Sequence, residues 1–166
     1  MLVDTSLLVW LQRFIVVFFI FIPAIAHATD EVKQAPDHAI TQIRLTPRGS
    51  STPIVFSVRL AVTPSQHAYG LMFSPPLPAK SGMLFLFEDM KPRTFWMKNT
   101  PLPLSIAFID ASGRIVHMAD MAPLKEEPVP SIHPAMYALE MTQGWFSAHG
   151  VMVGQTIAGL PKASAR

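Results

Sequence analysis

The chain consists largely of short apolar runs of strand length, separated by prolines and glycines. Residues 53–62 (PIVFSVRLAV) place Phe56 and Val58 on one face and Ser57 and Arg59 on the other. This alternation is typical of a half-buried strand. Residues 83–87 (MLFLF) follow Gly82 and are continuously apolar, which predicts a strand buried on both faces. Such runs favour a chain built mainly from β-strands.

The rest of the pattern agrees with a β-rich fold. Further strands are expected at residues 93–98, 104–109, 114–118, 136–141 and 151–157, with a hairpin turn at 110–113 (DASG). Two short helices are expected, at 65–69 after Thr63-Pro64 and at 143–149 after Thr142. A parallel sheet would require long crossover helices. We therefore expect an antiparallel, jelly-roll-like sandwich or a partly closed barrel with two short helices.

The N-terminal segment has the pattern of an export signal. Arg13 precedes an apolar run at 14–22, Pro23 breaks the run, and Ala26-His27-Ala28 supplies the small residues that a signal peptidase accepts. We predict a signal peptide at residues 1–28, cleaved after Ala28, and a periplasmic or secreted protein. The alternative is a retained anchor over residues 7–26, and membrane contact is expected only through such an uncleaved segment.

Composition divides the remaining chain. Residues 29–52 are polar and interrupted by prolines and a glycine, which predicts a flexible leader with at most one short strand near 40–45. A single β-rich domain is expected at 53–160, followed by a disordered tail at 161–166. The chain has no cysteine, so this domain must be stabilised by its core alone.

Several classes of function are not expected from this sequence. The net charge is +2 and the basic residues are scattered, so we expect no nucleic-acid partner. No cofactor is expected, because the chain has neither the cysteine pair nor the His-x-x-x-His spacing of a zinc site. It also lacks the Gly-x-Ser-x-Gly elbow of many hydrolases.

About a hundred residues of the chain resemble one protein family in a single register. The matching blocks are residues 70–73 (GLMF), 82–85 (GMLF), 95–100 (FWMKNT), 103–104 (PL), 109–110 (ID) with Gly113, Glu140, 144–145 (GW), 149–150 (HG) and 153–154 (VG). On these blocks the chain resembles domain of unknown function family 192, a group of small, often exported bacterial and archaeal proteins. The resemblance implies a mostly antiparallel β fold of jelly-roll character with small helices. It implies no activity.

The strongest candidate for a site is the segment Lys98-Asn99-Thr100, which lies between two hydrophobic runs. Buried polar groups need partners, and a ligand can supply them. Trp96 would form an apolar wall of the same pocket. The alternative is structural: Asn99-Thr100-Pro101 has ordinary turn chemistry, and Lys98 can reach solvent beside Trp96.

Glu140 completes the candidate site. It shares a face of its predicted strand with Met136 and Ala138, and a carboxylate in such surroundings usually has a cationic partner. Lys98 or Arg93 would be that partner. The two readings are a structural ion pair and an acid/base pair in a cleft.

Three hypotheses about function follow. The first is an exported binding or accessory module for a small polar or anionic envelope ligand, such as a glycan, held by Trp96, Lys98, Asn99, Thr100 and Glu140. The second is an envelope enzyme that uses Glu140 and Lys98 as an acid/base pair. The third is a copper-handling protein using His117, Met118 and Met121, because imidazole and thioether groups suit Cu(I). Core packing is the alternative explanation for the methionines.

Overall fold

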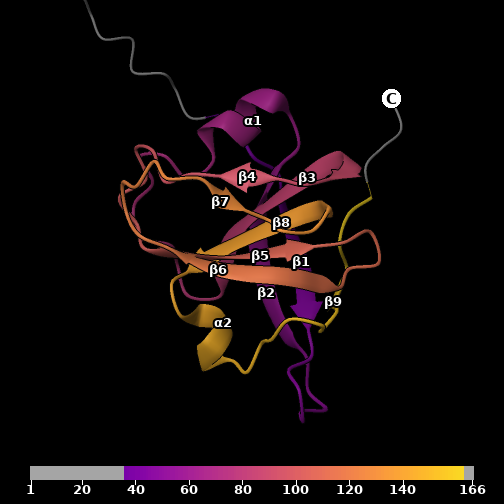
Figure 1. Cartoon of the computed structure of the whole chain (residues 1–166). Helices are drawn as coiled ribbons and strands as arrows, with labels where there is room; N and C mark the ends of the chain where they lie inside the picture. The colour runs from indigo at the N-terminus through magenta and orange to yellow at the C-terminus, as the bar shows by residue number, and fades with distance from the viewer. Residues whose placement is uncertain (1–35, 163–166) are drawn as a thin grey trace, which may run out of the picture. The chain divides into compact units, whose positions relative to one another are not determined.

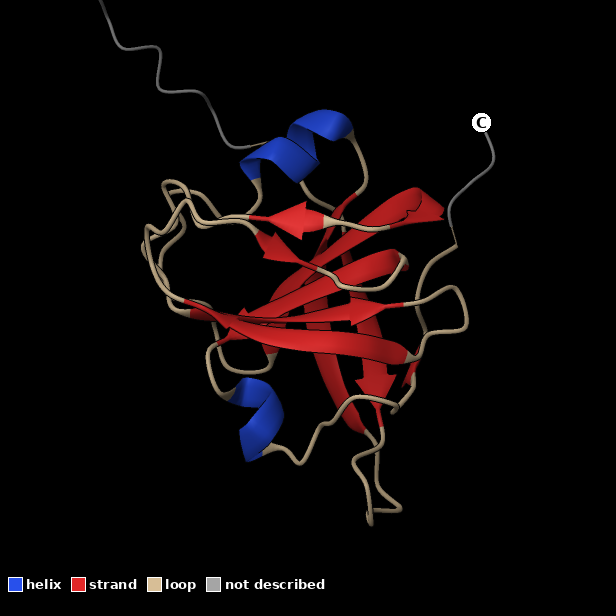
Figure 2. Cartoon of the chain, viewed as in Figure 1, coloured by secondary structure: helices blue, strands red, loops and turns tan. Residues whose placement is uncertain are grey.

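Seven strands form one curled sheet in the computed structural model, which describes residues 36–162 (Figure 1). The order across the sheet is β6 (Ile115–Met121), β5 (Leu104–Ile109), β8 (Ala135–Thr142), β3 (Ser81–Lys91), β2 (Ile54–Ala61), β1 (Ile40–Leu45) and β9 (Ile157–Ala158). A two-stranded ribbon of β4 (Thr94–Phe95) and β7 (Val129–Pro130) lies beside it, and the helices are α1 (Pro64–Tyr69) and α2 (Trp145–Ala148). The prediction of a mainly β, partly closed barrel with two short helices is confirmed (Figure 2).

One pair of strands departs from the antiparallel pattern. β2 and β3 run parallel, with Arg59 opposite Met83, whereas the other pairs in the sheet are antiparallel. The connection between them, residues 62–80, contains α1 followed by a proline-rich loop. One short helix and a loop therefore complete a crossover that we expected to require a long helix.

The sheet divides the core into two clusters. Because side chains alternate along each strand, Leu84 and Leu139 point to one face and Met83 and Phe85 to the other. The first face packs against Phe146 of α2 and is called the α2 face below. The second packs against the β4–β7 ribbon and the residues after α1, and is called the α1 face.

Strands β3 and β8 approach closely at Gly82. A Cβ atom at this position would overlap the main-chain oxygen of Glu140 and the sulfur of Met141. Glycine therefore allows the Met141 side chain to pack on the α2 face while β8 stays in register.

Local signals explain the turns and α1. Thr63 caps α1 with its side chain, which accepts from the Gln66 main-chain N–H, and Gln66 returns a bond to the Thr63 N–H. In the β5–β6 hairpin the Asp110 carboxylate accepts from the main chain of Ser112 and Arg114, and Gly113 has φ +87°. The predicted short helix after Thr63-Pro64 and the predicted hairpin turn at residues 110–113 are both confirmed. α2 begins later than expected, with Gly144 rather than Thr142 as its N-cap.

Two of the expected strands are wrong. Residues 93–98 form a strand only at Thr94–Phe95, because the N–H of Met97 donates to Lys125 O in a loop instead of a ladder. Residues 151–157 are mostly turns, and only Ile157–Ala158 forms β9.

The packed domain begins earlier than residue 53. β1 lies between β2 and β9, and Ile43 and Leu45 are each 1% exposed. The segment expected to be a flexible leader therefore supplies an inner strand. The predicted signal peptide and the last four residues lie outside the described part of the chain. No helix within residues 36–162 is long and apolar enough to cross a bilayer.

Candidate functional site

Glu140 is a carboxyl group built into the middle of the sheet. It lies on β8 between Met83 of β3 and Ile106 of β5, on the α1 face, and only 4% of its surface is exposed. Its carboxyl group has no hydrogen bond or ion pair to any residue from 36 to 162. Burial raises its pKa to about 8, while the positive charge of Arg59 acts in the opposite direction. The group is therefore mostly protonated and neutral at pH 7.

The Glu140 side chain lies at the wall of a small cavity. The cavity has a volume of about 30 Å³ and is bounded by α1, by the residues that follow α1, and by Phe85, Phe95 and Trp96. Such a volume accommodates one water-sized group. Among residues 36–162, Glu140 is the one carboxyl group in its lining, beside the polar side chains of His67, Tyr69 and Trp96.

A larger groove adjoins this cavity. It has a volume of about 330 Å³ and shares His67, Phe85, Phe95 and Trp96 with the cavity. The ring centroids of Phe85 and Phe95 lie 4.9 Å apart in an edge-to-face arrangement. The ring of His67 lies 4.8 Å from that of Phe87. The groove and the cavity, together called the aromatic groove below, thus share one wall, and Glu140 lines the cavity.

The charged groups near the aromatic groove are already engaged or neutral. The Arg93 guanidinium lies 4.0 Å from the centre of the Phe87 ring, forms an ion pair with Asp89 and donates to Ala135 O. A ring nitrogen of His67 bonds to Ala61 O at 3.0 Å, and burial lowers the pKa of this imidazole. The aromatic groove is therefore suited to a neutral polar ligand rather than to a strongly charged one.

The structure brings together two of the five residues expected at the site. Trp96, which is 48% exposed, and Glu140 line the same cavity. Lys98 places its ammonium 5.3 Å from the centre of the Trp96 ring. Neither Lys98 nor Arg93 pairs with Glu140, so the prediction of its cationic partner is wrong. The cation whose charge lowers the pKa of Glu140 is Arg59.

The segment 97–100 instead holds three loops together through its main chain. Met97 N–H donates to Lys125 O, Thr100 O accepts from Leu124 N–H, and Asn99 O accepts from the main chain of residue 73. The hydroxyl of buried Thr100 donates to Lys98 O, whereas Asn99 is exposed with φ +53°. Neither Asn99 nor Thr100 borders the cavity. This geometry corresponds to the structural alternative of a turn.

The methionines and histidine of the copper hypothesis do not converge. His117, Met118 and Met121 lie on β6, where alternation places Met118 on the opposite face from the other two. Met118 packs against the α2-face cluster, Met121 is 2% exposed in the α1-face cluster, and His117 stacks on Phe108 at 6.0 Å. Four residues along a strand separate His117 from Met121 by about 13 Å. Within residues 36–162, no group of three or more His, Cys, Asp or Glu side chains is arranged to hold a metal.

Two residues near the site were not assigned a role from the sequence. His67 lies on α1, and the pattern gave only a short capped helix there. Arg59 was placed on the polar face of its strand, and nothing indicated that the connection 62–80 would cover this face. The one available signal was the position of Arg59 within an otherwise apolar strand.

The chain matches a protein family and several solved structures. The family model of domain of unknown function 192, described as "Uncharacterized ACR", matches residues 44–159. A Sinorhizobium meliloti protein described as a "putative transcription regulator" is 35% identical, with a TM-score of 0.72 over 76% of this chain and 100% of its own. A Novosphingobium aromaticivorans protein of unknown function is 31% identical, with a TM-score of 0.67 over 74% of this chain and 93% of its own. The comparison with curated proteins gives no match.

Proposed function

This chain belongs to the domain of unknown function 192 family, and we propose that it is an exported binding module for a small, polar, glycan-like ligand of the cell envelope. The observation that carries the proposal is the buried carboxyl of Glu140, which lines the cavity of the aromatic groove and has no hydrogen bond or ion pair to residues 36–162. The proposal of export is based on the signal-peptide pattern of residues 1–28.

The chemistry of the aromatic groove matches a sugar-like ligand. A protonated carboxyl both donates and accepts hydrogen bonds, so Glu140 can bind a hydroxyl or carbonyl group. Leaving a buried polar group unsatisfied costs about 1–3 kcal/mol, and a ligand hydroxyl would recover part of this cost. Trp96 and Phe95 present ring surfaces against which the apolar face of a sugar ring can pack.

A nuclear magnetic resonance titration tests the binding site. Diacetylchitobiose, maltose and N-acetylmuramic acid are added to the isotope-labelled protein, and the Trp96 indole N–H and the amides of residues 69–72 are followed. We expect at least one sugar to shift these signals. Trp96→Ala and Glu140→Leu should each weaken its binding about tenfold or more, whereas Glu140→Gln, which also donates and accepts hydrogen bonds, should retain part of it. Trp145→Phe is the control, because Trp145 packs against Phe56 on the α2 face.

Two outcomes contradict the proposal. One is the absence of any shift at these positions with all three sugars. The other is equal affinity in the Trp96→Ala and Trp145→Phe proteins. We do not extend the description of the Sinorhizobium protein to this chain, because the basic residues here are scattered through the sequence.

An enzyme is the second candidate function. A carboxyl with a pKa of about 8 carries a proton near neutral pH, which suits a general acid. Lys98 is not the second member of an acid/base pair in this enzyme hypothesis, because it does not border the cavity. Incubation with chitin and peptidoglycan fragments measures turnover. Full turnover in Glu140→Gln would remove the role of Glu140.

A further inference from the structure

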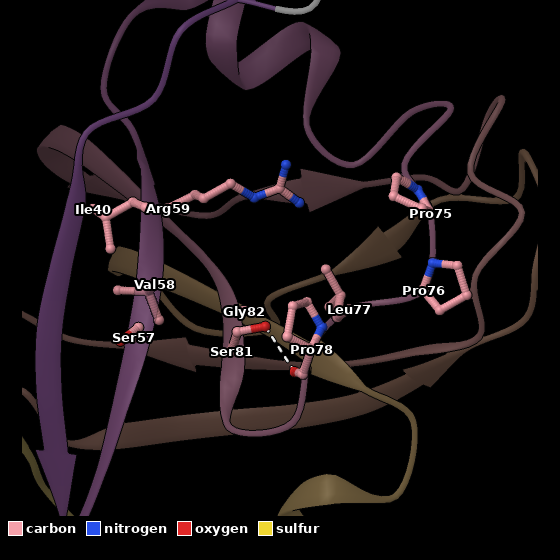
Figure 3. Close-up of a pocket in the computed structure, with 10 residues that line it drawn as sticks. All are labelled: Ile40, Ser57, Val58, Arg59, Pro75, Pro76, Leu77, Pro78, Ser81 and Gly82. Atoms are coloured by element: carbon pink, nitrogen blue, oxygen red, sulfur yellow. Dashed lines mark hydrogen bonds between the residues drawn. The ribbon is translucent and has the colours of Figure 1, made fainter.

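A second pocket lies on the same face of the sheet, and it shares no residue with the aromatic groove. Its volume is about 250 Å³, and it lies between β2 and the loop of Pro75, Pro76, Leu77 and Pro78 (Figure 3). This volume is below the usual range for drug-sized ligands, so the pocket is suited to a small molecule. We call it the Arg59 pocket.

Arg59 is the charged residue in its lining. Figure 3 shows the side chain extending from β2 toward the proline-rich loop. The guanidinium is partly buried, and it forms no ion pair or side-chain hydrogen bond with any residue from 36 to 162. A guanidinium stays protonated in proteins and presents five N–H donors in a planar fork. The pocket therefore contains a permanent cation without a counter-ion among residues 36–162.

The sheet keeps the acidic group on this face away from Arg59. Met83 of β3 lies between Arg59 of β2 and Glu140 of β8 in register. Glu140 influences Arg59 electrostatically, but the two side chains do not form an ion pair. The site is thus open to an external anion.

The rest of the lining is mainly apolar and contributes few hydrogen bonds. The three prolines have no N–H group, and the Ser81 hydroxyl is already bonded to Pro78 O at 2.7 Å. Ser57 lies on the same face of β2 as Arg59, two residues away, and its hydroxyl is available. Leu77 and Ile40 extend the apolar surface. One fixed cation beside a hydroxyl and a rigid apolar wall matches a small anionic head joined to an apolar tail.

We propose that the Arg59 pocket binds a monocarboxylate with a short alkyl tail, as in a medium-chain fatty acid. The carboxylate pairs with the planar guanidinium, a geometry that permits two parallel N–H···O bonds. The tail packs against Leu77 and the neighbouring prolines. This site does not depend on the proposed function of the aromatic groove, because no lining residue is common to both.

Titration with octanoate, below its micelle concentration, tests the proposal by calorimetry and by amide shifts in nuclear magnetic resonance. We expect saturable binding, with the largest shifts at Ser57, Ser81 and Gly82. Acetate lacks the tail and octanol lacks the charge, so each should bind at least tenfold more weakly.

Variants test whether the Arg59 guanidinium binds the carboxylate. Arg59→Met keeps an unbranched, flexible stem without the guanidinium and should weaken octanoate binding about tenfold or more, whereas Arg59→Lys should retain part of it. Arg44→Met is the matched control, because Arg44 is an exposed arginine on β1 outside the pocket. Thermal unfolding of each variant confirms that it is folded.

Three results would overturn the proposal. They are unchanged octanoate affinity in folded Arg59→Met, octanol binding as tightly as octanoate, and shifts confined to His67 and Trp96 of the aromatic groove. The last result would place the anion at the other site.

Discussion

Glu140 occupies a position where its cross-strand neighbours are Met83 and Ile106, which are both fully buried. An ionised carboxylate without a partner is expensive to bury, so the folded protein retains the proton. The folded pKa of about 8 lies above the ordinary value of 4.5. Between these two values the folded state binds a proton that the unfolded chain releases. The free energy of unfolding must therefore fall as the pH rises through this window.

Replacing Glu140 with glutamine should remove this pH dependence. From pH 5 to pH 8.5 we expect the wild-type free energy of unfolding to fall by about 4 kcal/mol, since one pKa unit corresponds to about 1.4 kcal/mol. Glu140→Gln should show a much flatter profile and should equal or exceed the wild type in stability at pH 8.5. Urea unfolding at several pH values measures this. His67 and Arg59 remain in both proteins, so their titration cancels in the comparison.

Glu126→Gln provides the control for the same measurement, because Glu126 is exposed. It should keep the wild-type slope. Equal pH profiles for the wild type and Glu140→Gln between pH 5 and 8.5 would show that Glu140 is ionised in the folded protein.

At the residue scale, the sequence predicted that Glu140 is a buried carboxyl group but did not predict which cation lies near it. The apolar neighbours along β8 predicted a buried carboxyl group, and the structure has one. The cation was assigned to Lys98 or Arg93, because strand patterns do not specify which loops cover a face. Arg59 was placed on the polar face of β2 for the same reason: the connection 62–80, which covers that face, is a long-range feature.

The helix α1 positions one side of the aromatic groove, and Gln66 connects it to the rest of the domain. The Gln66 side-chain oxygen accepts from the N–H groups of Val62 and Thr63, and its nitrogen donates to Asp37 O. Three bonds from one side chain join the helix start to the end of β2 and to the segment before β1. This explains how a helix of six residues can be held in place.

Gln66→Ala should therefore destabilise the protein by about 2 kcal/mol, and Thr63→Ala by about 1 kcal/mol. Chemical unfolding gives both values. Gln42→Ala, at an exposed glutamine on β1, should change stability by less than about 0.5 kcal/mol. If Gln66→Ala were no more destabilising than Gln42→Ala, the capping network would not hold α1.

Whether an element could be predicted depended on how much of its structure is local. β2, β3, β5 and β8 carry apolar patterns of their own, and the sequence identified each within a few residues. β4, β7 and β9 have two residues each, so their existence depends on the strand opposite. The parallel pairing of β2 with β3 could not be predicted, because a short helix and a proline-rich loop, rather than a long helix, complete the crossover.

At the scale of the whole molecule, one connection builds both proposed sites. Residues 62–80 cross the α1 face between β2 and β3; α1 borders the aromatic groove, and Pro75–Pro78 form a wall of the Arg59 pocket. β1 and β9 complete the curled sheet at the other edge (Figure 2). The domain thus depends on β1; the composition of residues 29–52 allowed a short strand at 40–45 but not that it belongs to the packed domain.

Truncation tests this dependence on β1. A fragment of residues 36–162 should fold, whereas 53–162 should not, because it loses buried Ile43 and Leu45 and the strand that joins β2 to β9. Dispersed amide signals in nuclear magnetic resonance report folding. A folded 53–162 fragment would restore the shorter domain expected from the sequence.

The most direct test of the account is the titration of the Glu140 side-chain carboxyl carbon by ¹³C nuclear magnetic resonance, with the signal assigned by its loss in Glu140→Gln. Buried and without a partner, the carboxyl should titrate with a pKa near 8. A pKa near or below 4.5, the ordinary value, would mean that the group is solvated or paired with Arg59. The neutral polar contact in the aromatic groove would not remain in either case, and pairing with Arg59 would also remove the unpaired cation of the Arg59 pocket.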